Sequence, residues 1–216
     1  MKFYAEFDTD KIIRENYFSD YDYKGLIVEV GGATPEFLSM SKHFKDNGWR
    51  SIIIEPNPTF VKQHKDAGNE VYEFACSYED KDGEFTIVRQ RAEAYGGIVT
   101  DHSYSSIEVK ENYLKHNNFI LTEENSEKIN VKIKKLDTIL SELNINKIDI
   151  LSIDVEGWEI EVMKGLNTKN IDCKLIVVEN YLRENSYNTY FESIGYYLSD
   201  VKYNKIVNYN QIYLKK

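Results

Sequence analysis

The sequence predicts an α/β fold in which a mostly parallel sheet carries helices on both faces. Short apolar segments rich in β-branched residues alternate along the chain with segments of helical spacing, a pattern typical of parallel sheets. The chain has 216 residues, 42% of them hydrophobic, which is enough for a single domain with a full core. Right-handed crossovers between parallel strands then leave few topologies to consider.

The first half of the chain has a regular alternation of strands and helices. Buried strands are expected at residues 25–30, 51–58 and 70–77. Helices are expected between them, at residues 35–48 and 59–68. Pro35 suits the first turn of the earlier helix and Gly48 suits its end. Strand, helix and strand therefore follow one another as in a parallel sheet.

The middle of the chain, residues 78–135, lacks this regularity. It contains a hairpin arm at 82–88 and a half-exposed strand at 129–136, but residues 91–106 have no clean period. Long irregular segments inside compact domains are usually functional or disordered. We therefore expect an insertion that covers one end of the sheet as a lid.

The regular pattern returns after the insertion. Helices and strands are expected in turn at residues 136–143, 148–154, 159–166, 174–180 and 190–194. The tail, residues 195–216, alternates apolar and polar residues about a turn near Asn204, which predicts an antiparallel hairpin. Residues 25–77 and 136–216 would thus form a core of seven strands. Residues 1–24 would form an N-terminal cap, either over the site or in a homodimer contact.

Composition excludes several classes of protein. The formal net charge of −9 would repel a phosphate backbone, so nucleic acid is not the expected partner. No apolar run is long enough to span a membrane. The N-terminal residues carry acids and lysines throughout and form no secretory signal, so a cytoplasmic location is expected. Two distant cysteines, Cys76 and Cys173, are expected to be reduced thiols in the core.

Acidic residues, glycines and other small or polar residues stand where the predicted strands end. Ligands bind beyond the carboxyl ends of the strands in such sheets. The residues at these ends are Glu29 with Gly31 and Gly32, Glu55 with Pro56, Cys76 with Ser77, Asp154 with Glu156, and Glu179 with Asn180. We therefore expect the ligand site along this edge.

The acids at this edge disfavour a dinucleotide cofactor. The G-x-G-x-x-G turn that cradles two phosphates is not met, because Thr34, Pro35 and Glu36 stand where the later glycines should lie. A sulfonium cofactor with a ribose suits the acids better, since an acid after the second strand can accept from both ribose hydroxyls. Glu55 follows Glu29 by 55 − 29 = 26 positions, within one strand-helix-strand unit of roughly 30 residues. The spacing is compatible with S-adenosylmethionine.

The expected contacts to that cofactor come from the ends of several strands. They are Glu29, Gly31, Gly32, Glu55, Pro56, Cys76, Ser77 and Asp154. The glycines would let the backbone approach the amino-acid part of the cofactor. The apolar strand before Asp154 would place this acid beside the transferring methyl group.

Several stretches resemble the FkbM-type family of S-adenosylmethionine-dependent methyltransferases. They are VEVGGATPEF, IIIEPNP, LDTILSEL, DILSIDVEGWEIEVMKGL and LIVVEN. The hallmark of the family is a D-x-E-G-x-E run before a helix that ends in glycine, here Asp154, Glu156, Gly157, Glu159 and Gly165. The similarity covers residues 25–182 in the same order, and Pro35 replaces the last glycine of the first loop.

The resemblance implies a fold and an activity. The fold would be a Rossmann-like class I methyltransferase domain that ends in an antiparallel hairpin. The activity would be O-methylation, commonly of a sugar hydroxyl in a glycan or glycosylated metabolite. Methylation of another small hydroxylated or carboxylated metabolite is an alternative, and a catalytically silent binding module is another. The presence of an acid at each expected cofactor edge argues against a silent module.

A sugar hydroxyl must be oriented and must lose its proton during methyl transfer, and the sequence offers two routes. In one, Asp154 or His102 is the general base. In the other, Asp154, Glu179 and Asn180 bind Mg²⁺ or Ca²⁺, which lowers the pKa of the hydroxyl. Expected substrate contacts are Tyr104, Glu156, Glu179 and Asn180.

Other residues near these positions have simpler interpretations. Glu159 falls in the first turn of a predicted helix, where carboxylates are favoured by roughly 0.3 to 1 kcal/mol. Glu179 and Asn180 would cap the sheet edge if they bind no metal. His43 and His64 fall on predicted helices and are expected at helix surfaces or satisfied edges, outside the site.

Overall fold

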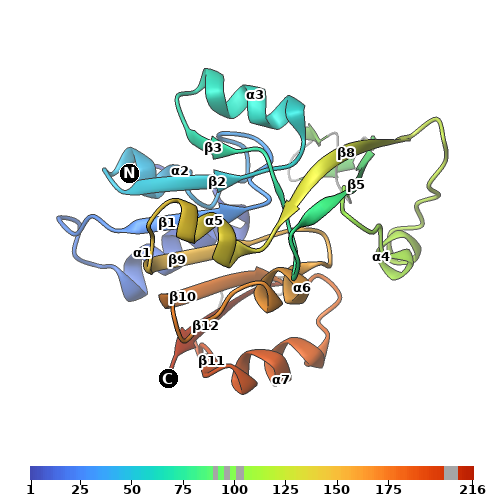
Figure 1. Ribbon diagram of the computed structural model, residues 1–216. Coiled ribbons are helices and arrows are strands. Elements are labelled where there is room, and N and C mark those ends of the chain that lie inside the picture. Colours follow the sequence, from blue (N-terminus) through green and yellow to red (C-terminus); the bar gives the residue numbers. More distant parts are fainter. Residues whose placement is uncertain (90–91, 95–97, 101–104, 202–208) are drawn as a thin grey trace.

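The computed structural model describes residues 1–89, 92–94, 98–100, 105–201 and 209–216. Its main sheet has seven strands in the order β11-β12-β10-β9-β1-β2-β3 (Figure 1). Their bounds are β1 Leu26–Val30, β2 Arg50–Ile54, β3 Glu70–Tyr72, β9 Lys147–Ile153, β10 Asp172–Glu179, β11 Tyr196–Leu198 and β12 Asn210–Lys215. Strands β3, β2, β1, β9 and β10 run parallel to one another, whereas β12 is antiparallel to both β10 and β11. The predicted parallel sheet and terminal hairpin are confirmed.

Helices cover both faces of the main sheet (Figure 1). They are α1 Thr9–Tyr17, α2 Lys42–Asp46, α3 Pro58–Asp66, α5 Leu136–Glu142, α6 Glu159–Lys164 and α7 Asn185–Ser193, with a short 3-10 turn, η1 Glu6–Asp8, before α1. One core joins α1 and α2 to the face that contains Ile27. A second core joins α5, α6 and α7 to the face that contains Val28. Consecutive strand residues thus bury opposite faces, as the pleat requires.

Two strands of the expected insertion, residues 78–135, join β4, which precedes the insertion, in a second, three-stranded sheet in the order β4-β8-β5. Its strands are β4 Ala75–Cys76, β5 Lys81–Val88 and β8 Ser126–Lys134, and β6 Ala92–Ala94, β7 Ile98–Thr100 and α4 Glu111–His116 lie between β5 and β8. The strand expected at 70–77 is therefore two short strands, one in each sheet. Because β4 follows directly after the carboxyl end of β3, the second sheet begins at the edge where ligands are expected (Figure 1).

The helix expected at 35–48 is much shorter, because only Lys42–Asp46 is helical. Leu38 has a φ of +59°, which an α-helix does not accommodate. The backbone amides of Met40 and Ser41 donate to the Glu29 carboxylate, at 2.7 and 3.2 Å. The buried acid thus binds this segment in place of a helical turn.

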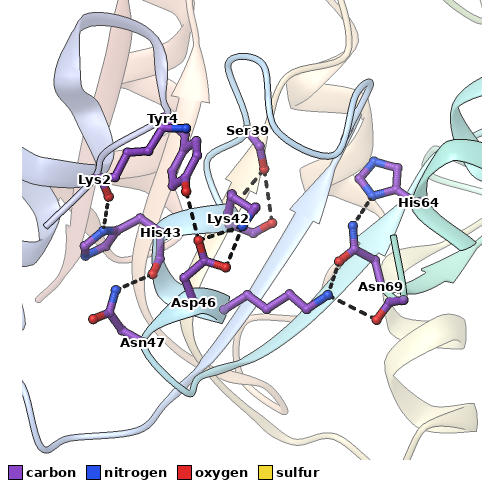
Figure 2. A network of polar contacts seen from close by, with 12 residues as sticks. Lys2, Tyr4, Ser39, Lys42, His43, Asp46, Asn47, His64 and Asn69 are labelled. Carbon is purple, nitrogen blue, oxygen red and sulfur yellow. Dashed lines mark hydrogen bonds and ion pairs between the residues drawn. The ribbon is translucent and has the colours of Figure 1, made fainter. Parts of the chain in front are cut away.

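The N-terminal residues pack along this loop and α2. The Tyr4 hydroxyl donates to Asp46 at 2.9 Å, and the His43 Nδ1 lies 2.8 Å from the Lys2 carbonyl oxygen (Figure 2). Ala5 forms a parallel bridge with Leu38.

In the described ranges of the chain, no helix has the length and apolar character needed to cross a membrane.

Candidate active site

The ends of β1, β2 and β9 come together at one glycine. The Gly31 amide donates to the carbonyl oxygen of Ile54 at 2.9 Å, and the Asp154 amide donates to the carbonyl oxygen of Val30 at 3.0 Å. Gly31 has a φ of +83°, and a Cβ there would lie 1.7 Å from the Asp154 carbonyl oxygen. Only glycine fits this close approach, which sets Asp154 directly beside the turn that follows β1.

Glu55 connects the end of β2 to the glycine turn. Its carboxylate accepts from the Ala33 amide at 3.0 Å and from the Asn57 amide at 2.8 Å. Burial raises the pKa of Glu55 to about 7, against these two hydrogen bonds, and the negative charge of Glu29 adds to the effect. Glu55 is therefore a buried carboxyl beside the glycine turn that is only partly ionised at neutral pH.

Glu29 points away from this edge toward the loop before α2. Its two oxygens accept from backbone amides there, and the Ser39 hydroxyl donates at 3.3 Å. Burial raises the pKa of this carboxyl above its ordinary value in spite of these donors. Glu29 shapes the loop that continues from Gly31 and Gly32, and its direct contact with a cofactor stays a prediction.

His64, expected outside the site, is fully buried against the glycine turn. The Asn69 amide oxygen accepts from the Lys45 ammonium, so the amide nitrogen of Asn69 faces the His64 Nδ1, at 2.8 Å (Figure 2). The His64 Nε2 is then the protonated nitrogen and donates to the carbonyl oxygens of Ala33 at 3.1 Å and Gly32 at 3.3 Å. Burial lowers the pKa of His64, which favours this neutral form.

A narrow apolar pocket opens beyond the ends of β1 and β2. Three residues expected to contact a cofactor line it: Gly31, Pro56 and Cys76. Phe74 and Trp158, which the sequence did not single out, form further parts of its wall. The cavity volume is only about 20 Å³, so the pocket as it stands is an apolar, aromatic-lined recess.

Ser77 and Cys76 support this pocket in different ways. The Ser77 hydroxyl accepts from the Trp158 indole at 3.0 Å and so fixes the orientation of the ring. Burial raises the pKa of the Cys76 thiol to about 12, which keeps it protonated and unreactive. Both residues therefore shape the wall and offer no nucleophile.

Three carboxylates meet at the ends of β9 and β10. One oxygen of each of Asp154, Glu159 and Glu179 lies within 4.8 Å of the others. Asp154 is exposed to solvent as a residue, but protein atoms crowd its carboxyl group. Desolvation of the carboxyl, together with the charges of Glu156 and Glu159, raises the pKa of Asp154 well above its ordinary value. Desolvation and the charge of Asp154 raise the pKa of Glu179 in the same way. The site thus concentrates negative charge.

The turn between β9 and α6 has a strained backbone. Glu156 and Gly157 have φ values of +59° and +91°, and such geometry at a non-glycine residue costs of order 1 kcal/mol or more. A Cβ on Gly157 would come within 3.1 Å of Lys110 and Tyr113, so the insertion packs directly on the turn. The glutamate and glycine of the sequence motif therefore shape a turn that the insertion covers.

Glu159 fixes this turn from inside the protein. It is fully buried, and one oxygen accepts from the amides of Val155 at 3.1 Å and Gly157 at 3.0 Å. Its other oxygen accepts from the Tyr187 hydroxyl of α7 at 2.6 Å. Glu159 does lie in the first turn of α6, as the sequence predicts. Nothing in the sequence indicates that it also binds the turn amides and Tyr187.

Asn180, expected as a metal ligand and substrate contact, is engaged elsewhere. Its amide oxygen accepts from the Glu184 amide at 2.8 Å, and its amide nitrogen donates to the Glu184 carbonyl oxygen and the Gln211 side chain. Its side chain therefore closes the loop after β10. The third acid beside Asp154 and Glu179 is Glu159, and a part for Asn180 in metal or substrate binding stays a prediction.

The two expected site residues of the insertion, His102 and Tyr104, lie outside the described residues.

A protein-family model, described as the methyltransferase FkbM domain, matches residues 29–205. A search of curated proteins found no match. The matched segment begins in β1, contains every strand end described above and extends beyond β11. Because it covers most of the chain, the protein belongs to the FkbM methyltransferase domain family.

Proposed function

We propose that this protein transfers the methyl group of S-adenosylmethionine to a sugar hydroxyl of a glycan or glycosylated metabolite. The observation that carries the proposal is the order of groups along one sheet edge. An acid, Glu55, lies in the chain between Ile54 and Pro56 of the apolar pocket and accepts from Ala33 of the glycine turn, and a second acid, Asp154, adjoins that turn. This order matches the base, the ribose and the reactive end of the cofactor.

The chain's own residues fit this cofactor. Phe74 and Trp158 of the pocket wall would flank the base. The Glu55 carboxylate would accept from the ribose hydroxyls. The backbone at Gly31 and Gly32 would lie along the amino-acid part. The lack of side chains there is essential, since a Cβ on Gly32 would meet Ile53 at 2.3 Å. S-adenosylmethionine supplies a methyl group on a positively charged sulfur.

Asp154 is the described acid best placed to receive the proton of the acceptor. As an oxygen–methyl bond forms, the hydroxyl loses its proton, and a carboxylate within hydrogen-bond reach accelerates that loss. Asp154 is partly exposed beside the glycine turn, although protein crowds its carboxyl, so an acceptor can approach it from the solvent side. One carboxylate oxygen would take the proton as the hydroxyl oxygen gains the methyl group.

A polar pocket beside the turn between β9 and α6 supports a sugar acceptor. Gly157 and Asn180 line it, together with Lys110, Asn112 and Glu184. The side chains of Lys110, Asn112 and Glu184 offer donors and acceptors that suit a molecule with several hydroxyls. We propose the insertion, residues 78–135, as the lid over this acceptor side, with His102 and Tyr104 as further contacts.

Calorimetric titration with S-adenosylhomocysteine tests the cofactor assignment. We expect the natural protein to bind it and not to bind NAD⁺. Glu55→Gln should bind about 10 to 100 times more weakly, because a hydrogen bond to a charged group contributes about 1.5 to 3 kcal/mol. Glu73→Gln is the matched control, since Glu73 lies just beyond β3 and is exposed. Equal affinity in both variants would move the ribose away from Glu55. Tight binding by the natural protein would justify a screen of nucleotide sugars, polysaccharides and glycolipids.

The pKa of Glu55, about 7, predicts how this affinity depends on pH. Ribose hydroxyls donate to the ionised carboxylate, so below pH 7 binding must release a proton. Affinity for S-adenosylhomocysteine should therefore rise about tenfold between roughly pH 6 and 8 and then level off. Glu55→Gln should show a flat profile across this range. A natural protein with the same flat profile would contradict the assignment.

In the protein without cofactor, the raised pKa of Glu55 makes the free energy of unfolding depend on pH. Because the folded pKa lies above the ordinary value of 4.5, burial favours the neutral carboxyl. This contribution to stability is complete below pH 4.5 and is lost as the pH rises to about 7. Thermal unfolding across that window, compared with Glu55→Gln, measures it without ligand.

A further inference from the structure

Glu179, at the end of β10, has an unusual environment. The residue is only 9% exposed, and among the described residues its Oε2 has no hydrogen-bond partner. A buried carboxylate oxygen without a donor is costly, and proteins avoid it unless a ligand or ion completes the site. The side chain faces Asp154 and Glu159, which are themselves acids. Within the part of the chain that the structure describes, Glu179 therefore has no positively charged partner.

The spacing of these carboxylates suits a metal ion. Their oxygens lie within 4.8 Å of one another. Two oxygens bound to one Ca²⁺ are at most about 4.6 to 5.2 Å apart, and two bound to one Mg²⁺ at most about 4.2 Å, from the usual metal–oxygen distances. The three acids thus lie within the span of one Ca²⁺ coordination sphere, and for Mg²⁺ the carboxylates would have to move slightly closer together. Both ions prefer oxygen ligands.

The three carboxylates are not equivalent. Both oxygens of Glu159 already accept hydrogen bonds, from two backbone amides and from Tyr187. Asp154 and Glu179 accept none from the described residues. These two acids are therefore the free ligands, and Glu159 adds negative charge behind them.

We propose that Asp154 and Glu179 bind a divalent cation of the Ca²⁺ and Mg²⁺ class at the carboxyl ends of β9 and β10. The cation balances the charge of the cluster and supplies the missing partner of Glu179. Its use in catalysis, to orient the acceptor hydroxyl and lower its pKa, rests on the proposed function. A carboxylate has two oxygens, so Asp154 can bind the ion with one and face the acceptor with the other.

Terbium luminescence tests the site without cofactor or acceptor. Tb³⁺ occupies oxygen sites that take Ca²⁺ and is sensitised by nearby tyrosine, here Tyr187. We expect a saturable signal that Ca²⁺ or Mg²⁺ displaces, and the same ion should raise the melting temperature. Asp154→Asn and Glu179→Gln should each lose at least about tenfold in Tb³⁺ affinity, since each removes one of two charged ligands. Glu111→Gln, at an exposed acid of α4, should bind like the natural protein.

The possible results separate the cation site from the proposed function. A signal that does not saturate, or that Asp154→Asn and Glu179→Gln leave unchanged, would overturn the cation site. Circular dichroism of each variant shows that it is folded, so a loss of signal reports the site. S-adenosylhomocysteine titration of the same samples tests the cofactor separately. Failure of terbium with intact cofactor binding would reject the cation alone.

Discussion

Asp154→Asn should lower kcat by about two to four orders of magnitude, the usual contribution of a general base. Asparagine keeps the size of the side chain but cannot accept a proton from the acceptor hydroxyl. Asp154 contacts the glycine turn through its backbone: its amide donates to the Val30 carbonyl oxygen, and its carbonyl oxygen lies beside Gly31. The substitution leaves both contacts unchanged. Cofactor affinity should therefore change little, and the loss should appear in turnover.

The measurement is methyl transfer under saturating cofactor, together with S-adenosylhomocysteine titration of the same preparation. His102→Ala is the informative comparison, because His102 is the other base that the sequence offers. If Asp154→Asn turned over like the natural protein while His102→Ala was inactive, the base would be His102. If both were fully active, neither residue would accept the proton.

The position of Asp154 was predictable because the hydrophobic pattern that identifies a buried parallel strand also shows where that strand ends. The same reasoning located Glu55 and Glu179 at the carboxyl edge of the sheet. The mostly parallel sheet and the hairpin followed from the alternation of elements and from the resemblance of the D-x-E-G-x-E run. Periodicity therefore predicted the fold and the edge on which the site lies.

The hydrogen-bond partners of the site residues were not predictable, because they come from distant parts of the chain. The helix expected at 35–48 fails because Glu29, buried at the end of β1, binds the amides of Met40 and Ser41. Local propensity contains no information on that acid. In the same way, Asn180 binds its own loop in place of a ligand.

The walls of the apolar pocket show the same limit. Phe74 follows a short strand and Trp158 lies inside the motif, and each reads as an ordinary apolar residue in its own segment. They share a pocket only because β4 leaves the main sheet and starts a second one. The one local signal is that Trp158 stands between Gly157 and Glu159 of the D-x-E-G-x-E run.

Glu159→Ala should destabilise the protein by about 2 to 4 kcal/mol, because it leaves three donors without an acceptor. The donors are the amides of Val155 and Gly157 and the hydroxyl of Tyr187. Each unsatisfied buried donor costs about 1 to 3 kcal/mol, and the relief of burying one carboxylate offsets part of the sum. Glu159→Gln keeps an oxygen for the amides and should cost about 1 kcal/mol or less. Urea unfolding of both variants measures the difference.

A double-mutant cycle with Tyr187→Phe separates positioning from packing. Phenylalanine removes the hydroxyl that Glu159 accepts, so in the Glu159→Ala background it should cost less than in the natural protein. We expect a coupling free energy of about 1 to 2 kcal/mol between the two positions. Strictly additive effects would mean that Glu159 acts through the turn amides alone. Because the strained turn at Glu156 and Gly157 depends on those amides, Glu159→Ala should also lower turnover, and Glu159→Gln should restore most of it.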